Sequence, residues 1–110
     1  MAFSYTFAQP EPTRAEIDAL PGPVLLEFGT DWCGHCRAAQ APLAEVLAAH
    51  GELRHIKVED GSGRRLGRSF GVKLWPTLIF LRDGQEQARV VRPREAAPIA
   101  QALATIAPPA

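Results

Sequence analysis

The chain is short of the features that mark several large classes of protein. It has two cysteines, one methionine and one tyrosine among its 110 residues, and its 12 basic side chains balance its 12 acidic ones. A formal net charge of zero gives no reason to expect a nucleic acid or an anionic membrane surface as a partner. No apolar run approaches the roughly 20 residues needed to cross a bilayer. These absences favour an ordinary globular protein.

Residues 1–20 also lack the marks of a secretory leader. They contain neither a basic first stretch nor an apolar central segment. We therefore expect a cytoplasmic protein; a periplasmic protein is the alternative if a leader has been removed.

The length suits one compact domain and is too small for two. Hydrophobic residues make up 46% of the chain and charged residues 22%, which is ordinary for a globular protein with its own core. We expect a single domain over residues 1–110, with residues 1–12 as an N-terminal extension or edge strand.

The two cysteines, Cys33 and Cys36, stand in one C-x-x-C motif. A disulfide-stapled scaffold spreads its cysteines so that they close long loops. A gap of two residues closes almost no loop and makes a poor staple. The pair is better explained as a reversible redox couple or as half of a metal site.

Apolar runs and turn signals predict alternating strands and helices. The predicted strands span 4–7, 24–28, 53–59, 77–81 and 87–91. The predicted helices span 14–20, 34–50, 63–70 and 94–106, and Thr13 and Glu16 have the spacing of a capping box at the start of the first. Strands that alternate with helices imply parallel crossovers, and Asp83-Gly84 predicts a hairpin with an antiparallel edge strand. The expected fold class is α/β, with a mixed sheet flanked by helices on both faces.

The motif Trp32-Cys33-Gly34-His35-Cys36 lies where a buried strand passes into a helix. Unpaired N–H groups and the helix dipole favour an anion at that position. Such a position lowers a thiol pKa toward neutral, and the thiolate is the attacking species. We therefore expect Cys33 to be exposed and to attack, and Cys36 to be more buried and to resolve the mixed disulfide.

His35 separates the two cysteines. When protonated, it would stabilise a Cys33 thiolate and so favour the dithiol over the disulfide. This makes the pair a stronger oxidant than one with an uncharged residue at that position. A solvent-exposed spacer is the alternative for His35.

Glu27 is a carboxylate in an otherwise apolar strand, six residues before Cys33. A buried, unpaired carboxylate is costly and tends to keep its proton. Behind the cysteines it could accept the proton of Cys36 as a general base. Lys57 in the neighbouring strand is the expected partner of Glu27. The alternative is a Glu27 side chain that points to solvent at the sheet rim.

Trp75-Pro76-Thr77 precedes the fourth predicted strand. A proline here is often an ordinary strand start, whereas a cis peptide would fix a backbone segment beside the cysteines. A substrate chain could then pair with that backbone as an added strand.

These residues together resemble the thioredoxin superfamily. The stretch from Leu26 to Cys36 resembles thioredoxins in framework. Its Cys-Gly-His-Cys motif and the position of Glu27 resemble protein disulfide isomerase domains. The similarity runs from about Val24 to Ile106 and includes Lys57, Pro76-Thr77 and Asp83-Gly84.

The resemblance implies a sheet of four or five strands, a cis Pro76, Cys33 as nucleophile and Cys36 as resolving thiol. It implies a redox-active disulfide between those cysteines and exchange with protein disulfides or dithiols. A reductase or another redox donor would be the second partner. We expect no cofactor and a monomer. The residues expected to bind substrate are Trp32, Gly34, Trp75, Pro76 and Thr77.

The sequence departs from the family pattern at three places. Pro42, which predicts a kink in its helix, lies one residue further from Cys36 than is usual. Arg92-Pro93 replaces a glycine that often lines the substrate groove. Trp75 is bulkier than the usual Ile, Val or Thr and should reshape that groove.

Two other interpretations stay open at this point. The first is a zinc site built from Cys33, Cys36 and one of His35, His50 or His55, although these histidines lack the usual paired spacing. The second is a non-enzymatic adaptor that holds a partner in the groove near Trp32 and Trp75.

Overall fold

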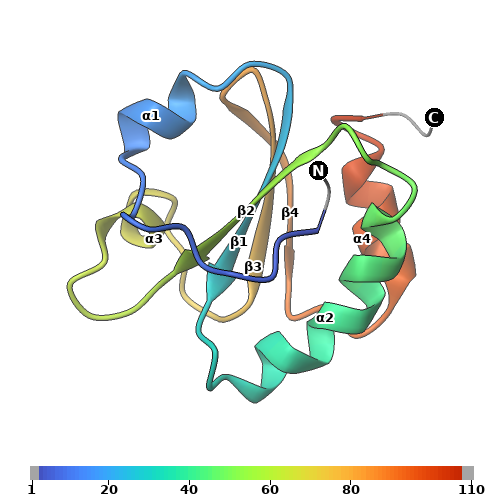
Figure 1. The fold of residues 1–110 in the computed structure, drawn as a ribbon, viewed down its shortest axis with the longest axis horizontal. Helices are drawn as coiled ribbons and strands as arrows, with labels where there is room; N and C mark the ends of the chain where they lie inside the picture. Colours follow the sequence, from blue (N-terminus) through green and yellow to red (C-terminus); the bar gives the residue numbers. More distant parts are fainter. Residues whose placement is uncertain (1–2, 108–110) are drawn as a thin grey trace.

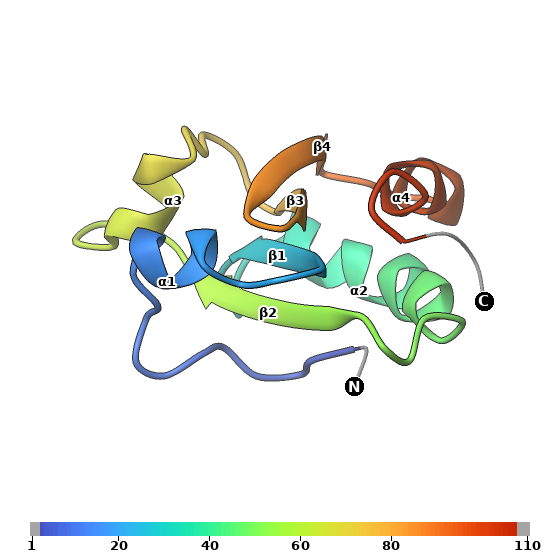
Figure 2. The same cartoon turned by 90° about the horizontal axis from the view of Figure 1, so that it is seen from above.

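A computed structural model describes residues 3–107, which form a four-stranded sheet covered by helices on both faces (Figures 1 and 2). The strands are β1 (Pro23–Gly29), β2 (Arg54–Glu59), β3 (Thr77–Arg82) and β4 (Gln85–Val91). The helices are α1 (Arg14–Asp18), α2 (Gly34–Leu47), α3 (Arg65–Ser69) and α4 (Ala96–Leu103). This architecture confirms the expected α/β thioredoxin fold.

The strand order in the sheet is β2-β1-β3-β4. β1 and β2 run parallel, whereas β3 is antiparallel to both β1 and β4. The expectation of parallel crossovers is therefore right for β1-α2-β2 and wrong for the connection through α3. The reason is that Thr77, the first residue of β3, pairs with Phe28 near the C-terminal end of β1. β3 therefore starts at the end of the sheet where β1 and β2 finish. The connection between β2 and β3 turns at this end of the sheet and brings residues 75 and 76 to the start of α2.

The predicted strand over 4–7 is wrong as a strand. Phe7 forms a single parallel bridge to Lys57, and the Ala8 N–H donates to the Lys57 carbonyl at 2.7 Å. Pro10 has no N–H with which to continue such a ladder. Within residues 3–107 the sheet therefore has four strands, and the N-terminal segment lies along the outer side of β2.

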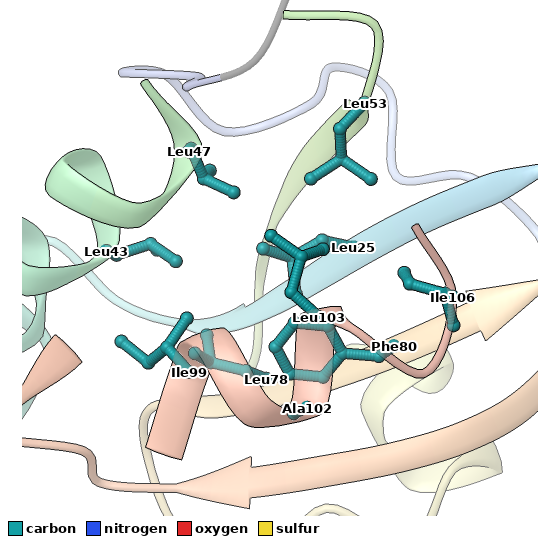
Figure 3. Close-up of a cluster of buried hydrophobic side chains, with 10 residues drawn as sticks. All are labelled: Leu25, Leu43, Leu47, Leu53, Leu78, Phe80, Ile99, Ala102, Leu103 and Ile106. Carbon is teal, nitrogen blue, oxygen red and sulfur yellow. The ribbon is translucent and has the colours of Figure 1, made fainter. Parts of the chain in front are cut away.

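Alternating residues of the central strands divide the core into two clusters. Figure 3 shows the cluster between the sheet and helices α2 and α4. It contains Leu25, Leu43, Leu47, Leu53, Leu78, Phe80, Ile99, Ala102, Leu103 and Ile106. The opposite face packs against α1 and α3 through Ile17, Leu66 and Phe70. Glu27 follows Leu25 by two residues, so it faces α2.

Local signals set several element ends. Thr13 and Glu16 form the predicted capping box at the start of α1. Asp83 and Gly84 both have positive φ, of 50° and 78°, which is the backbone of the predicted tight hairpin turn. Helix α2 contains Pro42 and ends at Leu47; the kink at Pro42 stays a prediction. In residues 3–107, no helix combines the length and the apolar character that crossing a bilayer requires.

Candidate active site

The cysteine pair lies at the end of β1, where the chain turns into α2. Both cysteines are free, and Cys33 is the N-cap residue of the helix. The backbone N–H of Cys36 donates to Cys33 Sγ at 3.2 Å. The Cys33 sulfur thus takes the place of the side-chain oxygen that usually caps a helix. A thiolate at this position gains both a hydrogen bond and the favourable end of the helix dipole.

The expected exposure of Cys33 is wrong in degree. Cys33 is 8% exposed and Cys36 is 4% exposed, so the expected order is confirmed although both residues are buried. The reason lies in the segment before β3, because the Cys33 sulfur is 3.9 Å from the Trp75 carbonyl oxygen. Cys33 is therefore the more accessible of the two cysteines, with a small part of its surface open to solvent.

Burial raises the pKa of the Cys36 thiol to about 12. Desolvation is the main cause, followed by the hydrogen bond with Cys33, and the charges of Cys33 and Glu27 act in the same direction. Gly29 leaves room for this sulfur, since a Cβ there would lie only 2.6 Å from Cys36 Sγ. Cys36 therefore needs a proton acceptor before it can act as a nucleophile.

Glu27 is buried behind the cysteines, with 1% of its surface exposed. Its two carboxylate oxygens have separate partners. Gln40 Nε2 lies 2.7 Å from Oε2 and His55 Nε2 lies 2.9 Å from Oε1. The alternative of a solvent-facing Glu27 at the sheet rim is excluded. Glu27 is instead part of a hydrogen-bonded buried network.

The predicted direct partnership of Glu27 with Lys57 is wrong. The two residues are neighbours in the β1–β2 register, but the hydrogen bond of Lys57 Nζ goes to Gln40 Oε1 at 3.2 Å. Gln40 also donates to the Cys36 carbonyl at 2.9 Å. Gln40 therefore joins Lys57, Glu27 and Cys36. This role of Gln40 was not predicted from the sequence, although the residue lies one helical turn after Cys36.

His55 is the second residue of this network, and its contact with Glu27 was not predicted from the sequence. Its side chain is fully buried, and its Nδ1 accepts a hydrogen bond from the Ser4 backbone N–H at 2.8 Å. Because Nδ1 is an acceptor, the ring proton of the neutral imidazole lies on Nε2 and is donated to Glu27. Its position two residues before Lys57 on the same strand face was the available signal.

The expected ligands of a zinc site do not come together. His55 is bound to Glu27 and Ser4, and His35 is exposed. Across residues 3–107, no group of three or more His, Cys, Asp or Glu side chains is placed to hold a metal ion. The zinc interpretation therefore has no support in this geometry.

The segment before β3 forms the other wall of the site. The Trp75–Pro76 peptide is cis, as the family resemblance implied, and Pro76 and Thr77 are buried. The Trp75 indole donates to Asp60 Oδ2 at 2.8 Å and packs edge-on against Trp32, with ring centroids 5.7 Å apart. Trp32 remains 66% exposed. The two tryptophans thus form an apolar rim beside Cys33.

Arg92 closes the site from the end of β4. Its backbone N–H donates to the Pro76 carbonyl and its Nε donates to the Trp75 carbonyl, both at 2.9 Å. Arg92 has a φ of 52°, a conformation that a residue with a side chain seldom adopts. The departure from glycine at this position therefore places a guanidinium on the same carbonyl that Cys33 faces.

Known proteins are similar to this chain in both sequence and fold. The family model for thioredoxin matches residues 7–105. The reduced form of thioredoxin 2 from Pseudomonas aeruginosa PAO1 is 59% identical, with a TM-score of 0.82 over 93% of this chain and 94% of that chain. The thioredoxin of Chlamydia trachomatis serovar D is 41% identical over 73 residues, which are 64% of this chain and 69% of the relative.

Disulfide isomerases are similar over a part of their length. Protein disulfide-isomerase A3 of Gallus gallus is 38% identical over 92 residues, which are 82% of this chain and 18% of that protein. The matches with four disulfide isomerases cover between 14% and 19% of the length of those proteins, and the match with a fungal thioredoxin covers 66% of it. The shared fold and the C-x-x-C motif at the start of α2 agree with these matches. The chain therefore belongs to the thioredoxin family, whose members are thiol–disulfide oxidoreductases, and Cys33 and Cys36 are its dithiol.

Proposed function

We propose that this chain exchanges disulfides with protein substrates, with Cys33 as the attacking sulfur and Cys36 as the resolving sulfur. The observation that carries the proposal is the hydrogen bond from the Cys36 N–H to Cys33 Sγ at the N-cap of α2. It stabilises negative charge on Cys33, the more exposed of the two cysteines.

The exchange proceeds in two displacements. The Cys33 thiolate attacks one sulfur of a substrate disulfide, forms a mixed disulfide and releases the other substrate sulfur as a thiolate. The Cys36 thiolate then attacks Cys33 Sγ, forms the Cys33–Cys36 disulfide and releases the remaining substrate sulfur. Two electrons pass from the dithiol to the substrate, and the reverse sequence oxidises a substrate dithiol.

Glu27 supplies the base for the second displacement. The raised pKa of Cys36 means that its thiol holds its proton at neutral pH. Glu27 is the carboxylate whose charge acts on Cys36, and Gln40 contacts both Glu27 and the Cys36 carbonyl. In this proposal the proton of Cys36 passes to Glu27, directly or through one water molecule, as the mixed disulfide is resolved.

His55 acts as a positioning residue for Glu27. It donates to Oε1 while Gln40 donates to Oε2, so the carboxylate is held by a donor on each oxygen. The Ser4 N–H fixes the imidazole tautomer that makes this donation possible. The N-terminal segment thus supports the proton acceptor, although it lies on the far side of β2.

The second partner is a dithiol donor such as a reductase, or a disulfide donor if the chain works as an oxidant. Equilibration with glutathione buffers of known ratio, followed by thiol titration, gives the fraction of the Cys33–Cys36 disulfide. A potential near that of cytosolic reductants assigns reduction of substrates, and a potential well above it assigns oxidation. A protein whose two thiols do not convert to a disulfide and back would contradict the proposed function.

A further inference from the structure

A cavity of about 630 Å³ opens beside the cysteine motif. One wall is the start of α2 and the other is the segment between β4 and α4. The lining residues are Gly34, His35, Ala38, Arg92, Pro93 and Arg94. We call this cavity the basic groove. It adjoins the site of Cys33, since Arg92 donates to the Trp75 carbonyl, which lies 3.9 Å from the Cys33 sulfur.

The charge of the basic groove has one sign. Arg92 and Arg94 are permanently charged, and His35 adds positive charge when it is protonated. The acidic neighbours in sequence, Asp31 and Glu95, are exposed and do not line the cavity. The chain as a whole has a formal net charge of zero, so this concentration of cations is local to the site.

The two arginines differ in how their donors are used. The Arg92 Nε is bound to the Trp75 carbonyl, which leaves its two terminal nitrogens available. The Arg94 side chain is exposed and has no hydrogen bond or ion pair to any other residue among 3–107. A guanidinium presents two parallel N–H groups that match a carboxylate. The N–H groups of Arg94 are thus free to donate to a carboxylate within the groove.

The backbone of Arg92 supports a role in binding rather than in stability. Its φ of 52° is a conformation that glycine adopts at no cost and that a larger residue adopts at some expense in stability. Residues held in such conformations cluster at binding and catalytic sites. Here the conformation directs the Arg92 guanidinium to the Trp75 carbonyl, which is also 3.9 Å from the Cys33 sulfur.

We propose that the basic groove binds an acidic side chain of the substrate segment that carries the reactive disulfide. The favoured substrates are protein disulfides in which an Asp or Glu lies within a few residues of the cysteine that Cys33 attacks. This inference rests on the proposed function, because it concerns the choice of substrate at the same sulfur. The carboxylate binds Arg94 and the free nitrogens of Arg92 while Cys33 attacks.

The test uses three peptide disulfides that differ only in the residues beside the cysteine, which are glutamate, glutamine or lysine. The rate of attack by the reduced protein is measured under second-order conditions at low salt and at 0.5 M salt. We expect the glutamate peptide to react about tenfold faster than the lysine peptide at low salt. The ratio should fall toward one at high salt, because exposed charges are screened.

Arg94→Gln and Arg92→Gln should each lower the preference for the glutamate peptide by about threefold at low salt. Arg54→Gln is the matched control, since Arg54 is exposed and pairs with Val24 at the opposite end of β1. Arg54→Gln also removes one positive charge and should leave the preference for the glutamate peptide unchanged.

Equal rates for the three peptides, or a preference that survives Arg94→Gln in full, would overturn the proposal. Glutathione disulfide, which also carries carboxylates, is run in parallel. An Arg94 dependence seen only with glutathione disulfide and not with the acidic peptide overturns the assignment to protein substrates. Failure of all three peptides to react with Cys33 would instead refute the proposed function itself.

Discussion

The two sulfurs of this site have different surroundings. Cys33 lies beside the Trp75 carbonyl, which also accepts a hydrogen bond from Arg92. Cys36 lies deeper, where burial and the charge of Glu27 raise its pKa. The side toward Cys33, which we call the open side, is partly exposed and basic. The side toward Cys36, which we call the closed side, is buried and contains the hydrogen-bonded carboxylate of Glu27.

In the proposed function, the two tasks of disulfide exchange fall to two regions of one small domain. Under that proposal, partner recognition belongs to the open side, which offers unused donors. Proton transfer belongs, in the same proposal, to the closed side, where Glu27 accepts hydrogen bonds from Gln40 and His55. Substitutions on one side should therefore change one step of the exchange and leave the other step nearly intact.

The largest effect comes from replacing the sulfurs themselves. Cys33→Ser should lower exchange by more than about 10³-fold, because the other thiol, Cys36, is more buried and keeps its proton. Cys36→Ser should keep the first attack and accumulate a stable mixed disulfide with a peptide substrate. Non-reducing electrophoresis distinguishes the two variants. A mixed disulfide that accumulates in Cys33→Ser rather than in Cys36→Ser would reverse the assigned roles.

Glu27→Gln tests the closed side alone. The resolving step should slow by about 10²-fold, which is the range of a general base, while the first attack keeps its rate. Stopped-flow tryptophan fluorescence, with Trp32 and Trp75 beside the site, can follow both steps. Glu45→Gln, an exposed substitution on α2, is the control and should change neither step. Equal slowing of both steps in Glu27→Gln would remove the proposed role of this carboxylate.

His55→Val should have a smaller effect on the same step. It removes one donor from a buried carboxylate and should destabilise the fold by about 1–3 kcal/mol. With one donor fewer, the Glu27 carboxylate is held less firmly beside Cys36. We therefore expect the resolving step alone to slow, by less than in Glu27→Gln, and His55→Gln to restore part of that rate. A loss of stability with both steps unchanged would show that His55 is only structural.

The smallest effect is a pH dependence of stability. The pKa of Cys36 is raised in the folded protein from 9.0 to about 12, so between these values the unfolded state binds fewer protons at this thiol. The stability contributed by the neutral buried thiol is therefore present below pH 9 and is lost as the pH rises toward 12. Denaturant unfolding of the reduced protein should show a steeper loss in this interval than Cys36→Ser shows. Identical slopes would contradict the burial of a protonated Cys36.

Much of the fold was predictable from local patterns. The apolar run around Leu26, the capping box at Thr13 and the hairpin at Asp83 each depend on residues close in sequence, and all three are confirmed. The direction of β3 was not predictable, because it depends on where a chain of 17 residues between Glu59 and Thr77 returns to the sheet. A local signal does not carry that information.

The same distinction applies to the site. The cysteine motif and the cis Pro76 follow from a short stretch of sequence and from the family resemblance. The partner of Glu27 does not, because it depends on which side chains meet between layers. Gln40 reaches Glu27 from α2, and the Ser4 N–H sets the proton of His55 from 51 residues away. The lateral neighbour Lys57 was the reasonable prediction from strand pairing, but its hydrogen bond goes to Gln40.

The proposed roles of Cys33 and Cys36 can be tested by finding which sulfur carries the substrate during exchange. The reduced protein is mixed with a peptide disulfide, quenched in acid within milliseconds, alkylated, digested and examined by mass spectrometry. We expect the peptide to be linked to Cys33, and we expect Cys36 to be found in its alkylated form, as a thiol that was free at the time of the quench. A peptide linked to Cys36, or divided evenly between the two sulfurs, would contradict the assignment of attack to one sulfur and resolution to the other.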